Sequence, residues 1–444
     1  MTVIGLDDTD SRERGMCTTY VAHRIAETLE RAGHTVERVL LVRLNPAVRY
    51  KTRGNAALAI HLADTGSGDG DQVATDPLET TRETVERLAA TADDRTNPGV
   101  IVADDRPDDV PDAVAKFTRS AIRDHLEIED AVAVADELGF RHWGVGDGRG
   151  RIGALAAIGA WQALADWTYE TISYREPDRW GTPREVDHDS VFRAADAGYP
   201  IVWDTVDRDE AEAVCVPHTP GPILHGIRGD EPARTREVAA AIEGEPVADR
   251  RTFVTNQGTD VHLRAVGALE ALDAALVDGR AYRLEGTVLT EPETRRGGHV
   301  FVDLGGVTDT DSVGDRGASL QCAAFEPTKR FRDRVRALRP GDRVTACGEL
   351  GRGTLKLEKF AVRDLVTVER VTPSCPGCGG TMESAGRNQG YRCRDCETST
   401  PEKDSRPLDR GLEVGWYEVP PCARRHIAKP LVRGGFDGPT HPER

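Results

Sequence analysis

The sequence contains very little lysine: seven lysines stand against fifty-one arginines among its 444 residues. Acidic residues are abundant, and the formal net charge is −17. Surface carboxylates keep proteins soluble at high salt, so this composition is typical of a chain adapted to a high-salt cell, with an ordinary acidic protein as the alternative. Phosphates attract cations, so any nucleic-acid contact must come from local basic clusters and not from the chain's overall charge.

Long apolar runs are also missing. No stretch approaches the length of a membrane-spanning helix, and the N-terminus lacks the apolar core of a signal peptide. These absences argue against membrane and secreted proteins, and we expect a cytoplasmic protein. A chain of this length is too long for one compact core, so we expect three or four domains.

Cysteine is sparse, and its spacing argues against a disulfide framework. Five of the nine cysteines are scattered, and the other four form two C-x-x-C pairs separated by fourteen residues. This spacing lies just below the usual linker range of a four-cysteine zinc site. Four thiolates suit tetrahedral Zn²⁺ in a structural role, with iron as the alternative. The predicted ligands are Cys375, Cys378, Cys393 and Cys396.

The order of predicted elements divides the chain into four segments. Residues 1–150 alternate strands and helices as in an α/β domain, and residues 151–278 again mix the two. Short alternating strands between 279 and 368 predict a small β-barrel of the OB type. Residues 369–444 carry the paired cysteines and a basic tail. The expected fold class is multidomain α+β.

Three aspartates, Asp7, Asp8 and Asp10, crowd the end of the first predicted strand. Alternate residues of a strand share a face, so Asp8 and Asp10 are expected to point the same way. Thr18 opens the next predicted helix, whose free amides suit an anion. Because Mg²⁺ binds carboxylates together with phosphate oxygens, this stretch indicates a Mg-nucleotide site. An Asp-rich turn that caps a helix is the alternative.

Further polar stretches are candidates for phosphate and small-ligand binding, although no Walker loop is present. Lys51 and Arg53 stand beside a glycine and are expected to clamp phosphates, with a solvated pair in a turn as the alternative. The stretch FVTNQGTDVHL surrounds one carboxylate with hydrogen-bonding groups, which suits a polar or cationic ligand; a capped turn is the alternative. Its candidate residues are Asn256, Gln257 and Asp260.

Two basic clusters stand out from the acidic background. One lies in the predicted barrel with phenylalanines interleaved, and the other lies in the C-terminal tail. OB-folds follow single-stranded nucleic acid by charge and stacking, so the clusters favour an RNA or DNA path; solvated helices are the alternative. The candidate contacts are Lys329, Arg330, Arg332, Arg424 and Arg425.

The combination of these pieces resembles the archaeal isoleucine-tRNA 2-agmatinylcytidine synthetases over nearly the whole chain. That family uses ATP to attach agmatine to carbon-2 of the wobble cytidine in an isoleucine tRNA with the anticodon CAU, so that AUA is read as isoleucine. The stretches that carry the resemblance include GLDDTDSRERGMCTTY, GRGRIGALAAIGA, TYETISYR, HGIRGD, TNQGTDVHL and GWYEVPPCARRHIAKPLVR.

The resemblance implies a role for each segment. The family's kinase-like N-terminal domain binds ATP and Mg²⁺ through an acidic motif that matches Asp7, Asp8 and Asp10. It also phosphorylates one of its own threonines, and the matching position is Thr18. A ferredoxin-like domain is associated with agmatine, and the OB-fold and zinc ribbon grip the tRNA. A monomer suits a protein that embraces one tRNA.

Agmatine carries two cationic groups, so its pocket needs carboxylates and other acceptors. Asp260 with Asn256 and Gln257 is the first choice, and Asp166 and Asp204 are further candidates. Two other functions stay open. One is a non-catalytic OB and zinc-ribbon protein that binds single-stranded nucleic acid, and the other is an ATP-dependent RNA modification with a different amine.

Overall fold

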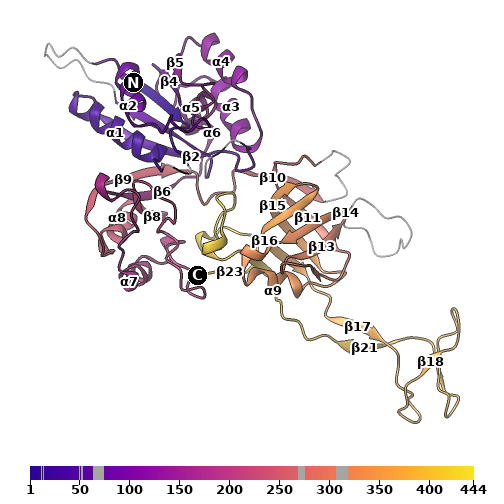
Figure 1. Cartoon of the computed structure of the whole chain (residues 1–444). Helices are drawn as coiled ribbons and strands as arrows, with labels where there is room; N and C mark the ends of the chain where they lie inside the picture. Colours follow the sequence, from indigo (N-terminus) through magenta and orange to yellow (C-terminus); the bar gives the residue numbers. More distant parts are fainter. Residues whose placement is uncertain are drawn as a thin grey trace.

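The computed structural model describes residues 1–11, 13, 15–49, 51, 54–63, 75–268, 276–306 and 319–444. Within these ranges, nine strands form one sheet across the N-terminal half, in the order β5-β4-β1-β3-β2-β9-β6-β8-β7 (Figure 1). The strands are β1 (Thr2–Asp7), β2 (Val36–Arg43), β3 (Ala56–Leu62), β4 (Gly99–Ala103), β5 (Arg141–Gly144), β6 (Thr168–Arg175), β7 (Val202–Trp203), β8 (Ile223–Gly229) and β9 (Val247–Thr255). The helices are α1 (Thr18–Arg31), α2 (Pro77–Leu88), α3 (Asp112–Arg123), α4 (Ile128–Glu137), α5 (Gly150–Ile158), α6 (Ala160–Ala163), α7 (His188–Gly198) and α8 (Pro232–Ala241).

The strands β1 to β5 pair antiparallel with one another, so the expected α/β N-terminal domain is wrong in this respect. Helix α1 connects β1 to β2 in the chain, and β3 lies between these two strands in the sheet. Strand β3 pairs antiparallel with both of them. Strand β4 pairs antiparallel with β1 and with β5. A fully buried apolar run reads the same way in parallel and antiparallel sheets, so the sequence pattern does not distinguish them. The whole chain is multidomain α+β, as predicted.

Helices cover both faces of this part of the sheet because its strands are apolar on both sides. Ile4 and Leu6 face α1 and α2 in one buried cluster. Val3 faces α3, α4 and α5 in another. Side chains of a strand alternate between faces, so adjacent residues of β1 belong to opposite layers. In the described part of the chain, no helix is both long enough and apolar enough to cross a membrane.

The sheet continues from the first segment into the second. Strand β2 pairs parallel with β9 through Leu40 with Val254 and Leu41 with Thr255. Strands β6 and β8 then continue the sheet antiparallel. Helix α8 packs against β6 and β8, and α7 packs against α8 and β7. The end of β1 and the middle of β6 therefore belong to one framework, which fixes the two sides of the site described below.

A five-stranded closed barrel follows in the described residues, as the OB-type pattern predicts. Its strands pair in the circular order β11-β13-β14-β16-β15-β11, and only β14 and β16 run parallel. Helix α9 lies between β14 and β15 in the chain. The elements are β10 (Leu263–Ala268), β11 (Ala281–Val288), β12 (Glu293–Thr294), β13 (Val300–Gly305), β14 (Ser319–Ala324), α9 (Phe331–Arg336), β15 (Arg343–Gly351) and β16 (Thr354–Asp364).

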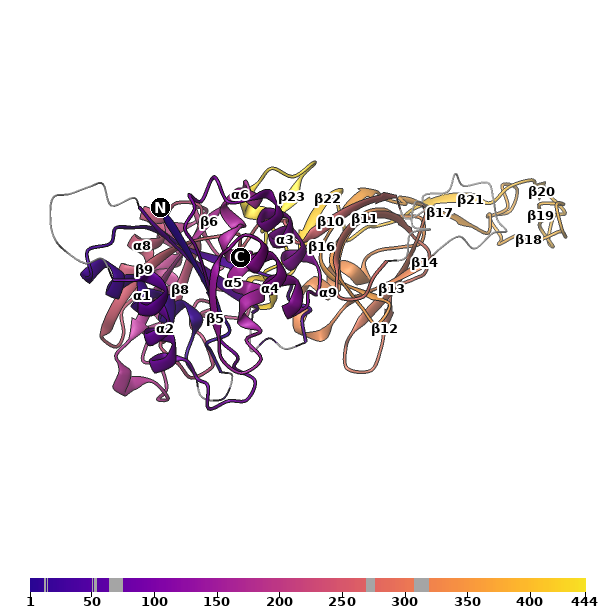
Figure 2. The same ribbon diagram turned by 90° about the horizontal axis from the view of Figure 1, so that it is seen from above.

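The four-cysteine segment projects away from the barrel on a two-stranded stalk (Figures 1 and 2). The chain then returns to the barrel, where β22 pairs antiparallel with β16 and parallel with β23. The C-terminal tail is therefore part of the main body and not of the ribbon. The elements are β17 (Val368–Val371), β18 (Glu383–Ser384), β19 (Tyr391–Arg392), β20 (Ser399–Thr400), β21 (Asp404–Pro407), β22 (Gly415–Glu418) and β23 (Thr440–His441).

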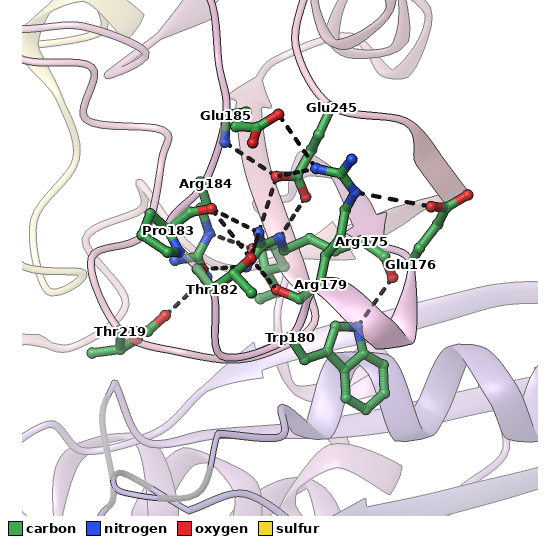
Figure 3. Close-up of polar contacts among 11 residues, drawn as sticks. Arg175, Glu176, Arg179, Trp180, Thr182, Pro183, Arg184, Glu185, Thr219 and Glu245 are labelled. Atoms are coloured by element: carbon green, nitrogen blue, oxygen red, sulfur yellow. Dashed lines mark hydrogen bonds and ion pairs between the residues drawn. The ribbon is translucent and has the colours of Figure 1, made fainter.

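A buried ion pair orders the loop after β6 (Figure 3). The Arg175 guanidinium donates to both carboxylate oxygens of Glu245, at 2.5 and 2.9 Å, and both side chains are fully buried. Its Nη1 and Nη2 also donate to the carbonyl oxygens of Thr182 and Pro183 in the loop, which adds partners for the buried charge. Arg184, further along the loop, donates to the carbonyls of Thr219 and Ile223. Thr219 and Ile223 line a cavity, so these contacts fix part of its wall.

Candidate active site

The three aspartates lie together at the end of β1, in the middle of the sheet. Asp8 has a φ of 58°, in the left-handed region, and its amide donates to Asp7 Oδ1 at 2.7 Å. The carboxylate of Asp8 in turn accepts from the amide of Asn97 at 3.0 Å. The carbonyl of Asp10 accepts from the Thr96 hydroxyl at 2.8 Å. The acidic segment is thus held by hydrogen bonds to the loop before β4.

Burial leaves the negative charge of this cluster poorly compensated. It raises the pKa of Asp7 well above its ordinary value, and the neighbouring charge of Asp8 adds to the effect. Burial also raises the pKa of Asp8 to about 7, with a contribution from Asp10, against the opposing effects of the Asn97 amide and Arg149. A cation would relieve this repulsion, and oxygen ligands of this kind suit Mg²⁺. The residues present therefore fit the ion.

Helix α5 packs against the cluster at unusually close range because its first turn is rich in glycine. A Cβ atom placed on Gly153 would lie 2.0 Å from Asp7 Oδ2, and one placed on Gly150 would lie 2.3 Å from the backbone nitrogen of Gly99. The stretch GRGRIG thus lets the helix approach β1 and β4 and hold the Asp7 carboxylate in place. Its glycines serve packing at the site.

Thr18 lies at the first position of α1, beside the aspartates. Its hydroxyl accepts a hydrogen bond from the buried Thr9 hydroxyl at 3.1 Å. The N-terminal amides of a fourteen-residue helix provide a positive end that favours phosphate. Thr18 is itself largely buried, at 5% exposure, yet it lines the cavity that the aspartates face.

A cavity of about 530 Å³ joins these groups. Asp7, Asp8, Asp10, Thr18 and Lys51 all line it, so the structure brings the predicted metal, threonine and lysine candidates together. Arg53 lies outside the described residues. Strands β6 and β8 and the C-terminal tail close the cavity on its other sides. The residues that they contribute include Glu170, Gly226, Arg228 and His426.

Two arginines and one carboxylate form the inner wall of the cavity. Glu170 is only 4% exposed and lies between Arg43, whose Nη2 is 3.6 Å from Oε2, and Arg228, whose Nε is 3.4 Å from Oε1. Oε2 of Glu170 has no hydrogen-bond partner among the described residues. A buried carboxylate oxygen without a hydrogen bond is costly, which favours a ligand that donates to it.

Asn256 and Gln257 lie behind this wall and hold Arg43. The amide of Asn256 exchanges two hydrogen bonds with the backbone of Arg43, at 2.7 and 3.0 Å. The Gln257 side chain accepts from Arg43 Nε at 2.8 Å. Asn256 and Gln257 are almost fully buried and, among the described residues, are not part of the cavity lining. Their observed contact is with the arginine and not with the open space.

The other carboxylates predicted for agmatine also have partners outside the cavity. Asp260 accepts from the buried Lys359 ammonium at 2.8 and 2.9 Å and from the Lys429 amide at 2.7 Å. Asp166 pairs with Arg433 at 3.2 Å, and Asp204 pairs with Arg424 at 2.9 Å. These contacts join the second segment to the barrel and the tail.

The predicted RNA-binding cations lie in internal contacts. Lys329 pairs with Glu210 at 3.2 Å, and Arg330 pairs with Asp207 at 3.0 Å, so both bridge the barrel to the second segment. Arg332 donates to the carbonyl of Gly298 at 2.9 Å.

The two arginines of the tail are also paired. Arg424 contacts Asp204 and Glu418, and Arg425 contacts Glu349 and Glu358. Lys329, Arg330, Arg332, Arg424 and Arg425 each have a carboxylate partner within 4 Å, which reduces the positive charge that they offer to RNA.

The four predicted zinc ligands are close together at the end of the ribbon. Sγ separations are 3.3 Å for Cys375–Cys396, 3.5 Å for Cys378–Cys393 and 3.8 Å for Cys378–Cys396. Tetrahedral Zn²⁺ with Zn–S bonds of about 2.3 Å places its sulfurs about 3.8 Å apart. The cluster therefore fits a structural zinc ion.

The sequence reading did not single out two residues that line the cavity, Glu170 and Arg43, and it placed His426 only in the basic tail cluster. Glu170 stands in the stretch TYETISYR, which forms β6. The alternation of side chains along a strand predicts which face of the sheet Glu170 occupies, but it does not predict that this face borders a cavity. Arg43 ends an apolar strand, and His426 stands within the basic tail. A charged residue in a run that is otherwise buried is the signal that points to Glu170 and Arg43. No local pattern brings His426 to the cavity.

A cavity that combines crowded carboxylates, a helix N-terminus and buried arginines is typical of an enzyme that handles phosphate groups. The five-stranded barrel is of the OB type, a fold that commonly binds oligonucleotides. The class is therefore that of nucleic-acid-modifying enzymes.

Comparisons with known proteins specify the family. The chain matches the models described as TiaS TCKD domain (residues 3–147), TiaS FLD domain (148–262) and TiaS C-terminal zinc ribbon domain (372–412). It is 54% identical to the isoleucine-tRNA 2-agmatinylcytidine synthetase TiaS of Haloquadratum walsbyi over 100% of both chains, and 45% identical to that of Methanosarcina mazei over 97% of both. The chain belongs to the TiaS family of isoleucine-tRNA 2-agmatinylcytidine synthetases.

Solved structures agree with this membership. The crystal structure of a TiaS complex with isoleucine tRNA and ATP superposes with a TM-score of 0.83 at 39% identity, covering 100% of this chain and 99% of the other. The structure of a TiaS complex with isoleucine tRNA, AMPCPP and agmatine gives a TM-score of 0.82 at 37% identity, with the same coverage.

The close approach of α5 gives a testable prediction. In Gly153→Ala the new methyl group displaces the Asp7 carboxylate, and misplacing a catalytic group by about 1 Å costs about 100-fold in rate. We therefore expect tRNA-dependent ATP turnover to fall by about that factor. The matched control is Gly411→Ala, where the nearest atom lies 3.9 Å from the new methyl. Wild-type turnover in Gly153→Ala would contradict this role of α5.

Proposed function

We propose that this protein uses ATP to attach agmatine to carbon-2 of the wobble cytidine in the isoleucine tRNA with the anticodon CAU, so that AUA codons are read as isoleucine. The observation that carries the proposal is the single cavity in which the acidic cluster, Thr18 and the Arg43–Glu170–Arg228 wall meet. Relatives of matching length bear the name of this activity, and solved relatives bind an isoleucine tRNA, an ATP analogue and agmatine.

The chemistry requires activation of a poor electrophile. The carbon-2 oxygen of cytidine leaves reluctantly, and phosphorylation by ATP converts it into a leaving group. The amine of agmatine then forms a bond to carbon-2, and the phosphorylated oxygen departs with its electron pair. Asp7, Asp8 and Asp10 would hold Mg²⁺, which neutralises phosphate charge during the transfer. Lys51, and Arg53 beside it, would orient the phosphates.

The cavity suits a kinase-like first step followed by transfer to an amine. Thr18 lies within it and is the residue we propose for self-phosphorylation. The wobble base must leave its anticodon stack to enter the cavity, as single-stranded RNA targets generally do. The chemistry therefore needs contributions from the first segment, the second segment and the tail at once.

We assign the recognition of agmatine to Glu170. It is a buried carboxylate on the cavity wall with one oxygen lacking a hydrogen bond, whereas Asp260 is committed to Lys359. An ammonium or guanidinium group beside Glu170 would complete the set of donors around that carboxylate. Asn256 and Gln257 support this site indirectly, because they hold Arg43 in place beside Glu170.

The remaining assignments complete the proposal. We divide the chain into a kinase-like ATP-binding domain (1–150), a ferredoxin-like domain (151–278), an OB-fold (279–368) and a zinc ribbon with the basic tail (369–444). The OB-fold and the ribbon would bind the tRNA, with Zn²⁺ stabilising the ribbon through its four cysteines. We place the enzyme in the cytoplasm, as a monomer that acts on one tRNA.

An incorporation assay tests the function. Purified protein in high-salt buffer receives ATP, Mg²⁺, labelled agmatine and a CAU-anticodon isoleucine tRNA transcript, with a transcript altered at the wobble base as the control. We expect label to enter only the first tRNA, and only with ATP. ATP consumption without labelling would contradict agmatine as the amine. Binding of tRNA without ATP turnover would identify a non-catalytic RNA-binding protein.

The Glu170 assignment has its own test. Glu170→Gln keeps the shape of the wall and removes the charge, so we expect the KM for agmatine to rise about 10- to 100-fold, the range for a hydrogen bond to a charged group. The KM for ATP should change much less. Asp260→Asn is the comparison: it weakens the ion pair with Lys359 and should affect both KM values alike. A selective agmatine defect in Asp260→Asn, with none in Glu170→Gln, would return the assignment to Asp260.

A further inference from the structure

The C-terminal tail contributes one imidazole to the cavity. His426 lines the cavity although it lies far along the chain from the N-terminal strands, beyond the barrel and the ribbon. A Cβ atom on Gly54 would lie 3.4 Å from His426 Cδ2 and 3.7 Å from Nε2, so an edge of the ring packs against the segment that follows Lys51. The imidazole therefore faces the region where the predicted phosphate-binding residues lie.

The residues on both sides of His426 are fixed firmly. Arg424 lies between Asp204 and Glu418, and Arg425 contacts Glu349 at 2.9 Å. Ile427 is fully buried. The next residues, Ala428 and Lys429, are also held, since Ala428 is 2% exposed and the Lys429 amide donates to Asp260 at 2.7 Å. Arg424 and Arg425, predicted to contact RNA, and Asp260, predicted to contact agmatine, thus hold the backbone on both sides of His426.

The ring itself has no such partner. Among the described residues, none forms a hydrogen bond or ion pair with His426, although the arginines directly before it in the tail are paired. Burial, with further contributions from Arg43, Arg228 and His262, holds the pKa of His426 well below its usual value. Of these groups, Arg43 and Arg228 lie against Glu170, and burial lowers the pKa of His262 to about 4. The imidazole is therefore neutral, and a ring nitrogen that carries no proton can accept a hydrogen bond from a donor in the cavity.

Other bases at the cavity are less suited to this role. Asp7, Asp8 and Asp10 form the cation site, and Glu170 is held between two arginines. Burial raises the pKa of Cys215 to about 12, so its thiol stays protonated. His125 also lines the cavity, but it is 53% exposed and lies 3.5 Å from Glu127.

We propose that His426 is the general base of the agmatine-transfer step, an inference that rests on the proposed function. The free amine of agmatine forms the N–C bond to carbon-2 of the phosphorylated cytidine, and the bond from carbon-2 to the phosphorylated oxygen breaks. Phosphate leaves with that electron pair, and one proton passes from the attacking nitrogen to a ring nitrogen of His426. A nitrogen that has just formed a bond to carbon is far more acidic than a free ammonium, so a weakly basic imidazole suffices.

The test separates the two chemical steps. His426→Ala and His426→Gln are compared with wild type and with His188→Ala, an exposed histidine outside the cavity. With radiolabelled ATP we expect phosphate to reach the tRNA at the wild-type rate and to accumulate there. Addition of labelled agmatine should slow about 100-fold or more in both variants, the usual contribution of a general base. Free imidazole should restore part of the rate in His426→Ala, where the side chain leaves space.

The result that overturns the proposal is equally specific. Wild-type agmatine addition in His426→Gln would exclude a base role, and so would an equal loss of both steps with weakened tRNA binding or a lowered Tm, since that pattern marks a packing role. If His426→Ala does not fold, His426→Gln alone tests the proposal. Its rate of tRNA phosphorylation is compared with its rate of agmatine addition, and a loss confined to agmatine addition supports the base role. Failure of wild type to add agmatine would instead overturn the proposed function.

Discussion

The repulsion among Asp7, Asp8 and Asp10 is the constraint on which the arrangement of the site depends. Carboxylates this close together cannot all stay ionised at a buried strand end without compensation, and the raised pKa values of Asp7 and Asp8 express that cost. The fold provides partial compensation through the Asn97 amide. A bound cation would compensate the rest, which is why we propose this cluster as the metal site.

The opposite wall of the cavity combines two positive charges with one negative charge. Arg43 and Arg228 lie on either side of Glu170, and Oε2 of that carboxylate has no hydrogen-bond partner among the described residues. The tail reaches the cavity at His426. Two residues before it, Arg424 is 6% exposed and lies between Asp204 and Glu418. Removing one partner of such a buried pair costs about 3–5 kcal/mol. The position of His426 therefore depends on contacts made by both the barrel and the second segment.

The sequence predicts the elements of this fold and the metal sites better than it predicts contacts between segments. Asp7, Asp8 and Asp10, Thr18 and the four cysteines are local patterns, and the structure brings each set together. Asp260 and Arg424 look available in the sequence, but their ion-pair partners lie far away in the chain and are added only by the tertiary fold. The order of strands in the N-terminal sheet cannot be predicted from local patterns either. Strand β3 inserts between β1 and β2, and only the tertiary fold determines that position.

The most direct measurement of the central claim is anomalous diffraction from crystals of the protein with tRNA, agmatine, a non-hydrolysable ATP analogue and Mn²⁺ in place of Mg²⁺. The account predicts an anomalous peak coordinated by carboxylates of the Asp7, Asp8 and Asp10 cluster, with density for agmatine beside Glu170 in the same cavity. A metal peak bound elsewhere, or agmatine density outside the cavity beside Asp260, would contradict the claim that one cavity holds the nucleotide, the amine and the base.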